Sequence, residues 1–138
     1  MLTELLSIHG DRIERKRRLA FAAATLGGKD ETLARMMRSY RTAIGDKTDE
    51  LVHLFEIRDS ISARFGNRTE ALRQLRFPKT RWSRLGELCN HLPLREGRHR
   101  GYFGPEIRSA SKEELSEARA LAIELIESYI HYLHPSAA

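Results

Sequence analysis

Residues 111–133 read SKEELSEARALAIELIESYIHYL, and this stretch decides the fold class. Ser111 and Glu114 have the spacing of a capping box, in which two side chains bond each other's backbone N–H groups at a helix start. The apolar residues after them recur every three or four positions, which is the period of one helix face. They are Leu115, Ala118, Ala122, Leu125, Ile126, Tyr129 and Leu133. We therefore predict a helix over residues 112–133 with this face turned into a core.

The same helical period covers most of the chain before this stretch. It predicts further helices over residues 11–26, 31–44, 49–65, 68–76 and 81–91. No alternating strand pattern and no internal repeat is present in the sequence. We therefore expect residues 1–138 to form a single all-α domain, a bundle of about six helices with one long loop over residues 92–110.

Polar residues that precede these helices are candidate N-caps. We expect Asp30 to cap the second helix, Asp46 or Thr48 the third, Asn67 the fourth and Thr80 the fifth. The apolar stripes of the first, second, third and fifth helices define the rest of the expected core. These residues are Ile13, Leu19, Ala20, Ala23, Leu26, Leu33, Met36, Met37, Tyr40, Ile44, Leu51, Leu54, Phe55, Ile61, Phe65, Trp82, Leu85, Leu88 and Cys89.

The composition excludes several classes of protein. Of the 138 residues, 41% are apolar and 31% are charged, which is typical of a globular domain rather than a disordered or membrane-spanning chain. The N-terminus lacks the basic start and apolar run of a signal peptide. The single cysteine, Cys89, excludes an internal disulfide and a multi-thiolate zinc site. We therefore expect a cytoplasmic protein of bacterial type, with no membrane segment and no cofactor.

The positive charge is concentrated in one part of the chain. The net charge is +5, and residues 76–111 alone hold eight basic and three acidic groups. Arginine supplies nineteen of the twenty-four basic residues, and its guanidinium suits bidentate phosphate contacts. A GC-rich genome would explain the ratio of arginine to lysine but not this clustering. A second basic run, residues 15–18, is interpreted as a solvated helix face, with nucleic-acid binding as the alternative.

The long loop carries the strongest functional signal. Its centre reads LREGRHRGYFGP over residues 94–105 and combines arginine, histidine, glycine and aromatic residues. Basic groups interleaved with aromatics are typical of a single-stranded RNA or phosphate site. Together with two arginines of the fifth helix, the candidate nucleic-acid-binding residues are Arg81, Arg84, Arg95, Arg98, Arg100 and Tyr102. The alternative is a solvated loop whose arginines pair with the acidic residues Glu113, Glu114 and Glu117.

Three short segments resemble a group of small bacterial helical proteins with HEPN-like character. They are LFEIRDSI over residues 54–61, RLGELCN over 84–90 and GRHRG over 97–101. The resemblance covers about a third of the chain. HEPN domains are helical bundles that often dimerise and often cleave RNA with a motif of arginine, four to six residues, and histidine. The resemblance therefore implies an RNA-binding domain, a metal-independent ribonuclease activity, and a homodimer or a partner subunit.

Two pairs of residues approach the HEPN motif. Arg95 and His99 have only three residues between them, one fewer than the motif has. Arg84 and His91 have six, and we expect both on one face of the fifth helix, although HEPN motifs usually lack a proline where Pro93 stands. A histidine can take the proton of the 2′-hydroxyl, and arginines stabilise charge on phosphorus. The candidate catalytic residues are His99, Arg98 and Arg95, with Arg84 and His91 as the alternative.

Two further interpretations compete with an RNA site. Residues 69–88 resemble a helix-turn-helix, with Arg81, Ser83, Arg84 and Glu87 placed to face a DNA groove. In that case the protein is a DNA-binding regulator. The third interpretation is a non-catalytic module for protein interaction.

Metal binding is the weakest of the hypotheses. Glu50-x-x-His53 has the spacing of one half of a di-iron site, but the second half is missing. Glu127, His131 and His134 share a helix face near the end of the chain, where a surface role is expected. We therefore predict no metal site.

Overall fold

The computed structural model of this chain describes residues 2–26, 28–97 and 107–135. Within them the protein is all-α, as predicted, with six α-helices, one short π-helix and no strand. The elements are α1 (Leu2–Leu26), α2 (Glu31–Gly45), α3 (Glu50–Phe65), α4 (Arg68–Leu75), α5 (Lys79–Gly86), the π-helix η1 (Glu87–His91) and α6 (Lys112–Leu133).

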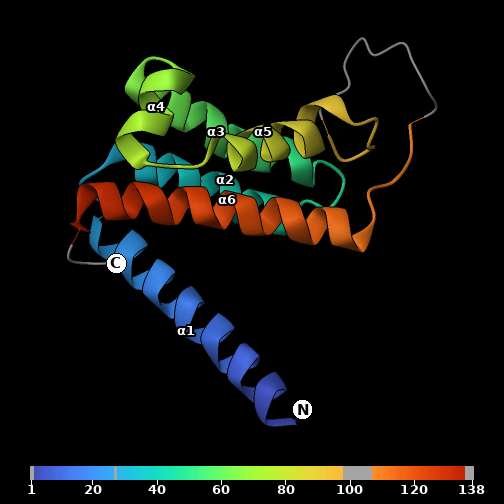
Figure 1. Cartoon of the computed structure of the whole chain (residues 1–138), viewed down its shortest axis with the longest axis horizontal. Helices are drawn as coiled ribbons and strands as arrows, with labels where there is room; N and C mark the ends of the chain where they lie inside the picture. The colour runs from blue at the N-terminus through green and yellow to red at the C-terminus, as the bar shows by residue number, and fades with distance from the viewer. Residues whose placement is uncertain (1, 27, 98–106, 136–138) are drawn as a thin grey trace.

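Helix α6 is the centre of the bundle. It packs against α2, α3, α4 and α5, and in Figure 1 it runs the length of the bundle in front of α2. The face predicted from its sequence is inside, because Ala118, Leu125, Ile126 and Tyr129 have no exposed surface. The capping box of Ser111 and Glu114 is also confirmed in both directions. The start, the end and the buried face of this helix therefore agree with the prediction.

Helix α1 differs most from expectation. It begins at Leu2, not at residue 11. Figure 1 shows that its C-terminal end lies at the bundle and that its N-terminal end points away from the bundle at an angle. Leu19 and Leu26 are buried, but Ile13 is 40% exposed and Ala20 is also exposed, contrary to the predicted core. Among the α1 side chains that the structure describes, Leu19 and Leu26 face the bundle, whereas Ile13, Ala20 and Phe21 lie on its exposed surface. The side chain of Ala23 lies outside the described residues.

The divergence of α1 also explains an error in α2. Ile44 was predicted to be inward but is 48% exposed, and Tyr40 is only half-buried. Both side chains lie where α1 has left α2 uncovered. The remaining stripe, Leu33, Met36 and Met37, is buried as predicted.

The predicted N-caps are correct for α2 and α4 and wrong for α3 and α5. The Asp30 carboxylate accepts the Leu33 N–H at 2.9 Å, and the Asn67 side chain accepts the Glu70 N–H at 2.8 Å. Helix α3 has Asp49 at its N-cap position, and the Asp49 side chain makes no capping hydrogen bond. The Asp46 carboxylate accepts the N–H of Asp49 itself, at 3.3 Å, and so does not cap the helix.

Helix α5 begins two residues before the predicted start. Pro78 is its N-cap residue, and the Pro78 carbonyl accepts the N–H groups of Arg81 and Trp82 at 3.2 and 3.1 Å. Thr80 therefore lies inside the helix rather than at its cap. The segment also does not continue as one α-helix to residue 91, because Glu87–His91 widen into η1.

Trp82 anchors α5 in the core. Its ring is 1% exposed and lies under the Arg58 guanidinium, whose carbon is 4.9 Å from the ring centroid. Arg58 also donates a hydrogen bond from Nη1 to the Trp82 carbonyl at 3.0 Å. The Cβ of any other residue at Gly86 would stand 2.2 Å from that Nη1, so glycine leaves the space that Arg58 fills.

Candidate functional site

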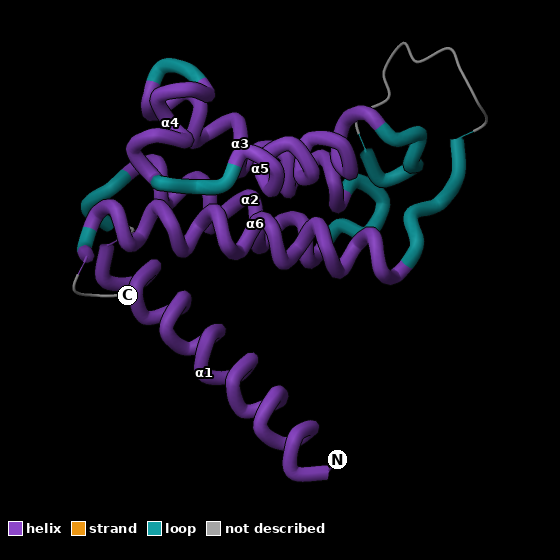
Figure 2. The backbone as a smooth tube through the Cα atoms, viewed as in Figure 1, coloured by secondary structure: helices purple, strands orange, loops and turns teal. Residues whose placement is uncertain are grey.

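The segment predicted as a structureless loop has an ordered base at both of its ends. Leu94 and Arg108 form an isolated parallel bridge, in which the Arg95 N–H donates to the Arg108 carbonyl at 2.8 Å. The Arg108 N–H donates to the Pro93 carbonyl at 2.9 Å. The Leu94 side chain has no exposed surface and belongs to the core. The segment that enters the loop and the segment that leaves it are therefore held side by side by backbone hydrogen bonds. Figure 2 draws both of them in teal, as loops.

Glu96 ties this base to the rest of the bundle. Its carbonyl accepts the N–H groups of Leu51 and Val52 at 3.1 and 3.2 Å. These amides are in the first turn of α3, where a helix has N–H groups without an internal partner. The Glu96 carboxylate accepts the Ala110 N–H at 3.0 Å, on the other side of the loop. One residue thus joins the incoming chain, the outgoing chain and α3.

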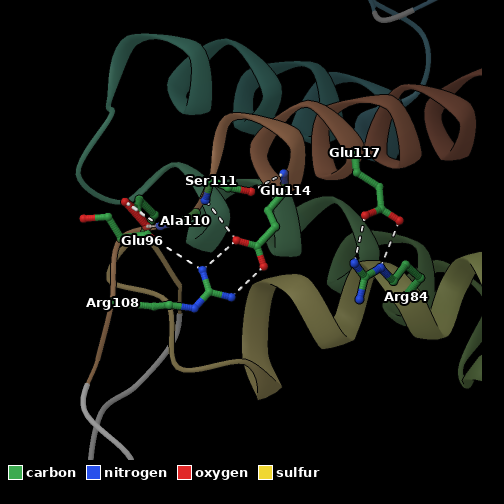
Figure 3. A network of polar contacts seen from close by, with 8 residues as sticks. Arg84, Glu96, Arg108, Ala110, Ser111, Glu114 and Glu117 are labelled. Atoms are coloured by element: carbon green, nitrogen blue, oxygen red, sulfur yellow. Dashed lines mark hydrogen bonds and ion pairs between the residues drawn. The ribbon is translucent and has the colours of Figure 1, made fainter.

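Arg108 and Glu114 extend this network to the start of α6 (Figure 3). The two Nη atoms of Arg108 donate to the two carboxylate oxygens of Glu114 at 2.7 and 2.8 Å. The Ser111 N–H donates to the same carboxylate at 2.9 Å. The Arg108 guanidinium, with the Ser111 N–H second, lowers the pKa of Glu114 to about 2. The carboxylate at the helix start is therefore held in its charged form.

Two of the candidate nucleic-acid-binding arginines are already engaged by α6. Arg84 donates from Nε and Nη2 to the Glu117 carboxylate, both at 2.9 Å, and also pairs with Glu87. This bidentate pair raises the pKa of Arg84 and lowers that of Glu117. Arg81 pairs with Glu124 of the same helix. The alternative interpretation paired arginines of the loop with the acidic last helix, and among the described loop residues this pairing is found for Arg108 with Glu114. The pairs that Arg84 and Arg81 of α5 make with α6 were not predicted.

Arg84 and His91 do not contact each other. Arg84 lies on α5, whereas His91 is the last residue of η1 and donates from Nδ1 to the Gly86 carbonyl at 3.2 Å. A π-helix has an extra residue in each turn, so it changes the direction in which later side chains point. The expectation that both project from one face of a regular α-helix is therefore wrong in its geometry.

Of the remaining candidates, only Arg95 is in the described part of the chain. Its side chain is exposed, and it makes no ion pair with a described carboxylate. Arg98, His99, Arg100 and Tyr102 lie outside the described residues. The site that the sequence predicts thus has a described base and a centre that stays a prediction.

The metal-ligand patterns have other partners. Glu50 is 1% exposed and pairs with Arg119 of α6, while the His53 Nε2 lies 3.0 Å from the Asp46 carboxylate. Within the described residues no group of three or more histidine, cysteine or carboxylate side chains could hold a metal ion. No helix of the described residues combines the length and the apolarity needed to cross a membrane.

The comparisons with known proteins assign no family to this chain. No family model matches it, and neither a curated protein nor a solved structure is significantly similar to it. Its function must therefore be argued from its own residues.

One set of basic residues was missed by the sequence reasoning. Lys16, Arg38 and Arg41 line a common groove between α1, α2 and α6. A signal was present, because Arg35, Arg38 and Arg41 are spaced three apart along α2 and the run 15–18 was noted on α1. Neither spacing says that the two helices meet, so the groove itself could not be predicted.

Proposed function

We propose that the protein binds single-stranded RNA through the loop between η1 and α6. The observation that supports this most is the ordered base of the loop, which Leu94, Glu96 and Arg108 join to the core, to α3 and to α6. Binding residues are commonly carried on loops that a rigid scaffold positions. The loop between these anchors has the arginines, glycines and aromatics of an RNA site.

The ion pairs narrow the set of phosphate contacts. The guanidinium groups of Arg81, Arg84 and Arg108 each form an ion pair with a carboxylate of α6. We therefore expect these three residues to contribute little to the affinity for RNA. Arg95 is exposed and makes no ion pair with a described carboxylate. We therefore assign the phosphate contacts to Arg95 and, on the sequence, to Arg98 and Arg100, with Tyr102 stacking on a base.

We further propose that His99 is the catalytic group if the bound RNA is cut. Its imidazole takes the proton of a 2′-hydroxyl, whose oxygen then bonds to phosphorus while the bond to the 5′-oxygen breaks. The leaving 5′-oxygen takes up a proton from water, and the imidazolium returns its proton to the solvent, so that the products are a 2′,3′-cyclic phosphate and a 5′-hydroxyl. Arg95 and Arg98 would stabilise the negative charge that builds on the phosphate. No metal ion is needed for this step.

Salt dependence tests the binding proposal. Three phosphate contacts give a log–log slope of affinity against salt of about −2 for a single strand, at roughly −0.7 per contact. Fluorescence anisotropy with a labelled unstructured RNA measures this slope. Replacing Arg95, Arg98 and Arg100 by glutamine should abolish most of the binding and flatten the slope. The matched control replaces Arg68, Arg73 and Lys79 by glutamine. It removes the same three positive charges from the α4 end of the bundle.

The result that contradicts the proposal is equal loss of affinity in the two triple variants, or no binding at low salt. A clear preference for one duplex DNA sequence would instead support the helix-turn-helix interpretation. Helices α4 and α5 have the required order, but Arg81 and Arg84 of α5 are held by α6.

Cleavage is tested separately, with end-labelled RNA in EDTA. We expect cyclic-phosphate products that disappear in His99→Ala while RNA binding remains. If His91→Ala abolishes cleavage and His99→Ala does not, the Arg84 and His91 pair carries the reaction. If the wild-type protein binds RNA without cutting it, the protein is a binding module and the catalytic proposal is wrong.

A further inference from the structure

A groove between α1, α2 and α6 has an unusual combination of charge and apolar surface. Its volume is about 980 Å³, at the upper end of the roughly 300–1,000 Å³ typical of ligand sites. Five of the residues that line it are arginine or lysine, and none of the described lining residues is aspartate or glutamate. The groove lining is thus more basic than the chain as a whole, which has nineteen acidic residues and twenty-four basic ones.

Two of the five cations are paired with carboxylates that do not themselves line the groove. Arg15 donates from Nε to both oxygens of Glu127 at 3.0 Å, and Arg119 pairs with the buried Glu50. Lys16, Arg38 and Arg41 are exposed and make no ion pair with any described carboxylate. The groove therefore presents three positive side chains that are not paired with any described carboxylate.

The rest of the lining is mostly apolar. Leu19 and Met37 are buried in its floor, whereas Ala20 and Ile44 are exposed, Ile44 by 48%. Tyr40 lies half-buried among them, and its burial raises the pKa of the phenol, so the hydroxyl stays a hydrogen-bond donor. An occupant would thus need an apolar body and a negatively charged end.

We propose that this groove binds a small anionic amphiphile of the class of medium-chain fatty acids. The alkyl chain of the fatty acid lies on Leu19, Met37 and Ile44, and its carboxylate is held by the cations of α1 and α2. Apolar pockets with a few placed polar groups are the usual form of such sites. A second copy of this basic protein would bring like charge to the rim, and inorganic phosphate would leave the apolar floor uncovered. This site is separate from the RNA loop and does not depend on it.

Calorimetric titration of the full chain with octanoate and decanoate, both below their micelle concentrations, is the first test. We expect saturable binding at one site. Affinity should rise about twofold to fourfold for each added methylene, the upper figure corresponding to complete burial. Decanol and decyltrimethylammonium have the same tail without the negative charge, and they should bind at least about tenfold more weakly.

Variants of the groove are the second test. Lys16→Gln and Arg41→Gln should each weaken decanoate binding about fivefold to tenfold, because each removes a charged partner of the carboxylate. Arg35→Gln removes the same charge from the same helix but does not line the groove, and it should change nothing. Ala20→Trp fills the groove from an exposed position and should abolish binding. Circular dichroism confirms that each variant keeps its helical fold.

Several results would overturn the proposal. Equal binding of decanol and decanoate would remove the role of the cations, and full binding by Ala20→Trp would place the ligand elsewhere. Binding only to anionic vesicles would mean a membrane surface rather than a single amphiphile. A dimer that Ile44→Glu dissociates would mean that a second copy covers the groove. An acidic amphipathic peptide that needs Arg41, with no binding of decanoate, would assign the groove to a partner helix.

Discussion

The buried ion pair between Glu50 and Arg119 offers a direct test of how α3 is held to α6. Glu50 begins α3 and is 1% exposed, while Arg119 of α6 is 35% exposed. Nη2 of Arg119 donates to the Glu50 carboxylate at 3.0 Å, and Nε donates to its other oxygen. Arg119→Met keeps most of the apolar stem but leaves a buried carboxylate without its partner.

The expected cost of Arg119→Met is large for a protein of this size. Breaking a fully buried pair costs roughly 3–5 kcal/mol, and the partial exposure of Arg119 favours the lower limit, about 3 kcal/mol. That is a large part of a typical stability of about 5–15 kcal/mol. With a urea dependence of about 2 kcal/mol per molar, the unfolding midpoint should fall by about 1.5 M.

Urea unfolding followed by circular dichroism measures this loss. Arg73→Met is the matched control, because Arg73 pairs with Glu70 on the exposed surface of α4, and its midpoint should not change measurably. The double variant Glu50→Gln, Arg119→Met should recover much of the stability, since it no longer buries an unpaired charge. If Arg119→Met loses no more than Arg73→Met, the pair does not hold α3 to α6 and the reasoning is wrong.

Three further predictions concern single groups. Burial raises the pKa of the Cys89 thiol to about 12, so it should not react with an aromatic disulfide reagent at pH 8 until urea unfolds the chain; rapid labelling of the native protein would contradict its burial. The Glu114 carboxylate should titrate near pH 2 by NMR, and Arg108→Gln should raise its pKa by about one unit or more. Its stabilising effect is complete above its ordinary pKa of 4.5 and is lost as the pH falls toward 2, so acid should unfold Arg108→Gln at a higher pH than the wild type. Trp82→Ala should cost about 3–5 kcal/mol in thermal or urea unfolding, because the ring is 1% exposed; a loss below 1 kcal/mol would mean that the core collapses around the cavity.

The parts of the fold that could be predicted depend on local signals. The box at Ser111 and Glu114 and the period after it define α6, and Asp30 likewise defines the start of α2. These signals involve residues three or four positions apart, which a helix brings together whatever surrounds it.

The parts that could not be predicted depend on contacts between distant elements. Periodicity identifies an apolar face but not the helix that covers it, so Ile44 was expected inside although α1 leaves it exposed. Arg84 and Glu117 are 33 positions apart, and no spacing rule connects them. The π-helix also has no clear sequence signal, because Leu88 and Cys89, which the helical period predicts to be inside, are buried in it as they were expected to be in an α-helix.

The candidate site shows the same division. The basic and aromatic composition of the loop is visible in the sequence, but its base is not. The contact of the Glu96 carbonyl with the first turn of α3 joins residues more than forty positions apart. A reader of the sequence alone therefore expects a structureless segment where the structure has anchored ends.

That contact gives the loop an internal reporter. The amide hydrogens of Leu51 and Val52 are covered by the Glu96 carbonyl, although they belong to a helix that the loop only touches. Their exchange with deuterated solvent then depends on how often the base of the loop separates from α3, in the same way that local opening sets exchange elsewhere in proteins. A molecule that settles on the loop and holds its base closed would slow the exchange of these two amides. Binding to the loop can thus be followed by measuring the exchange rates of these two amides of α3.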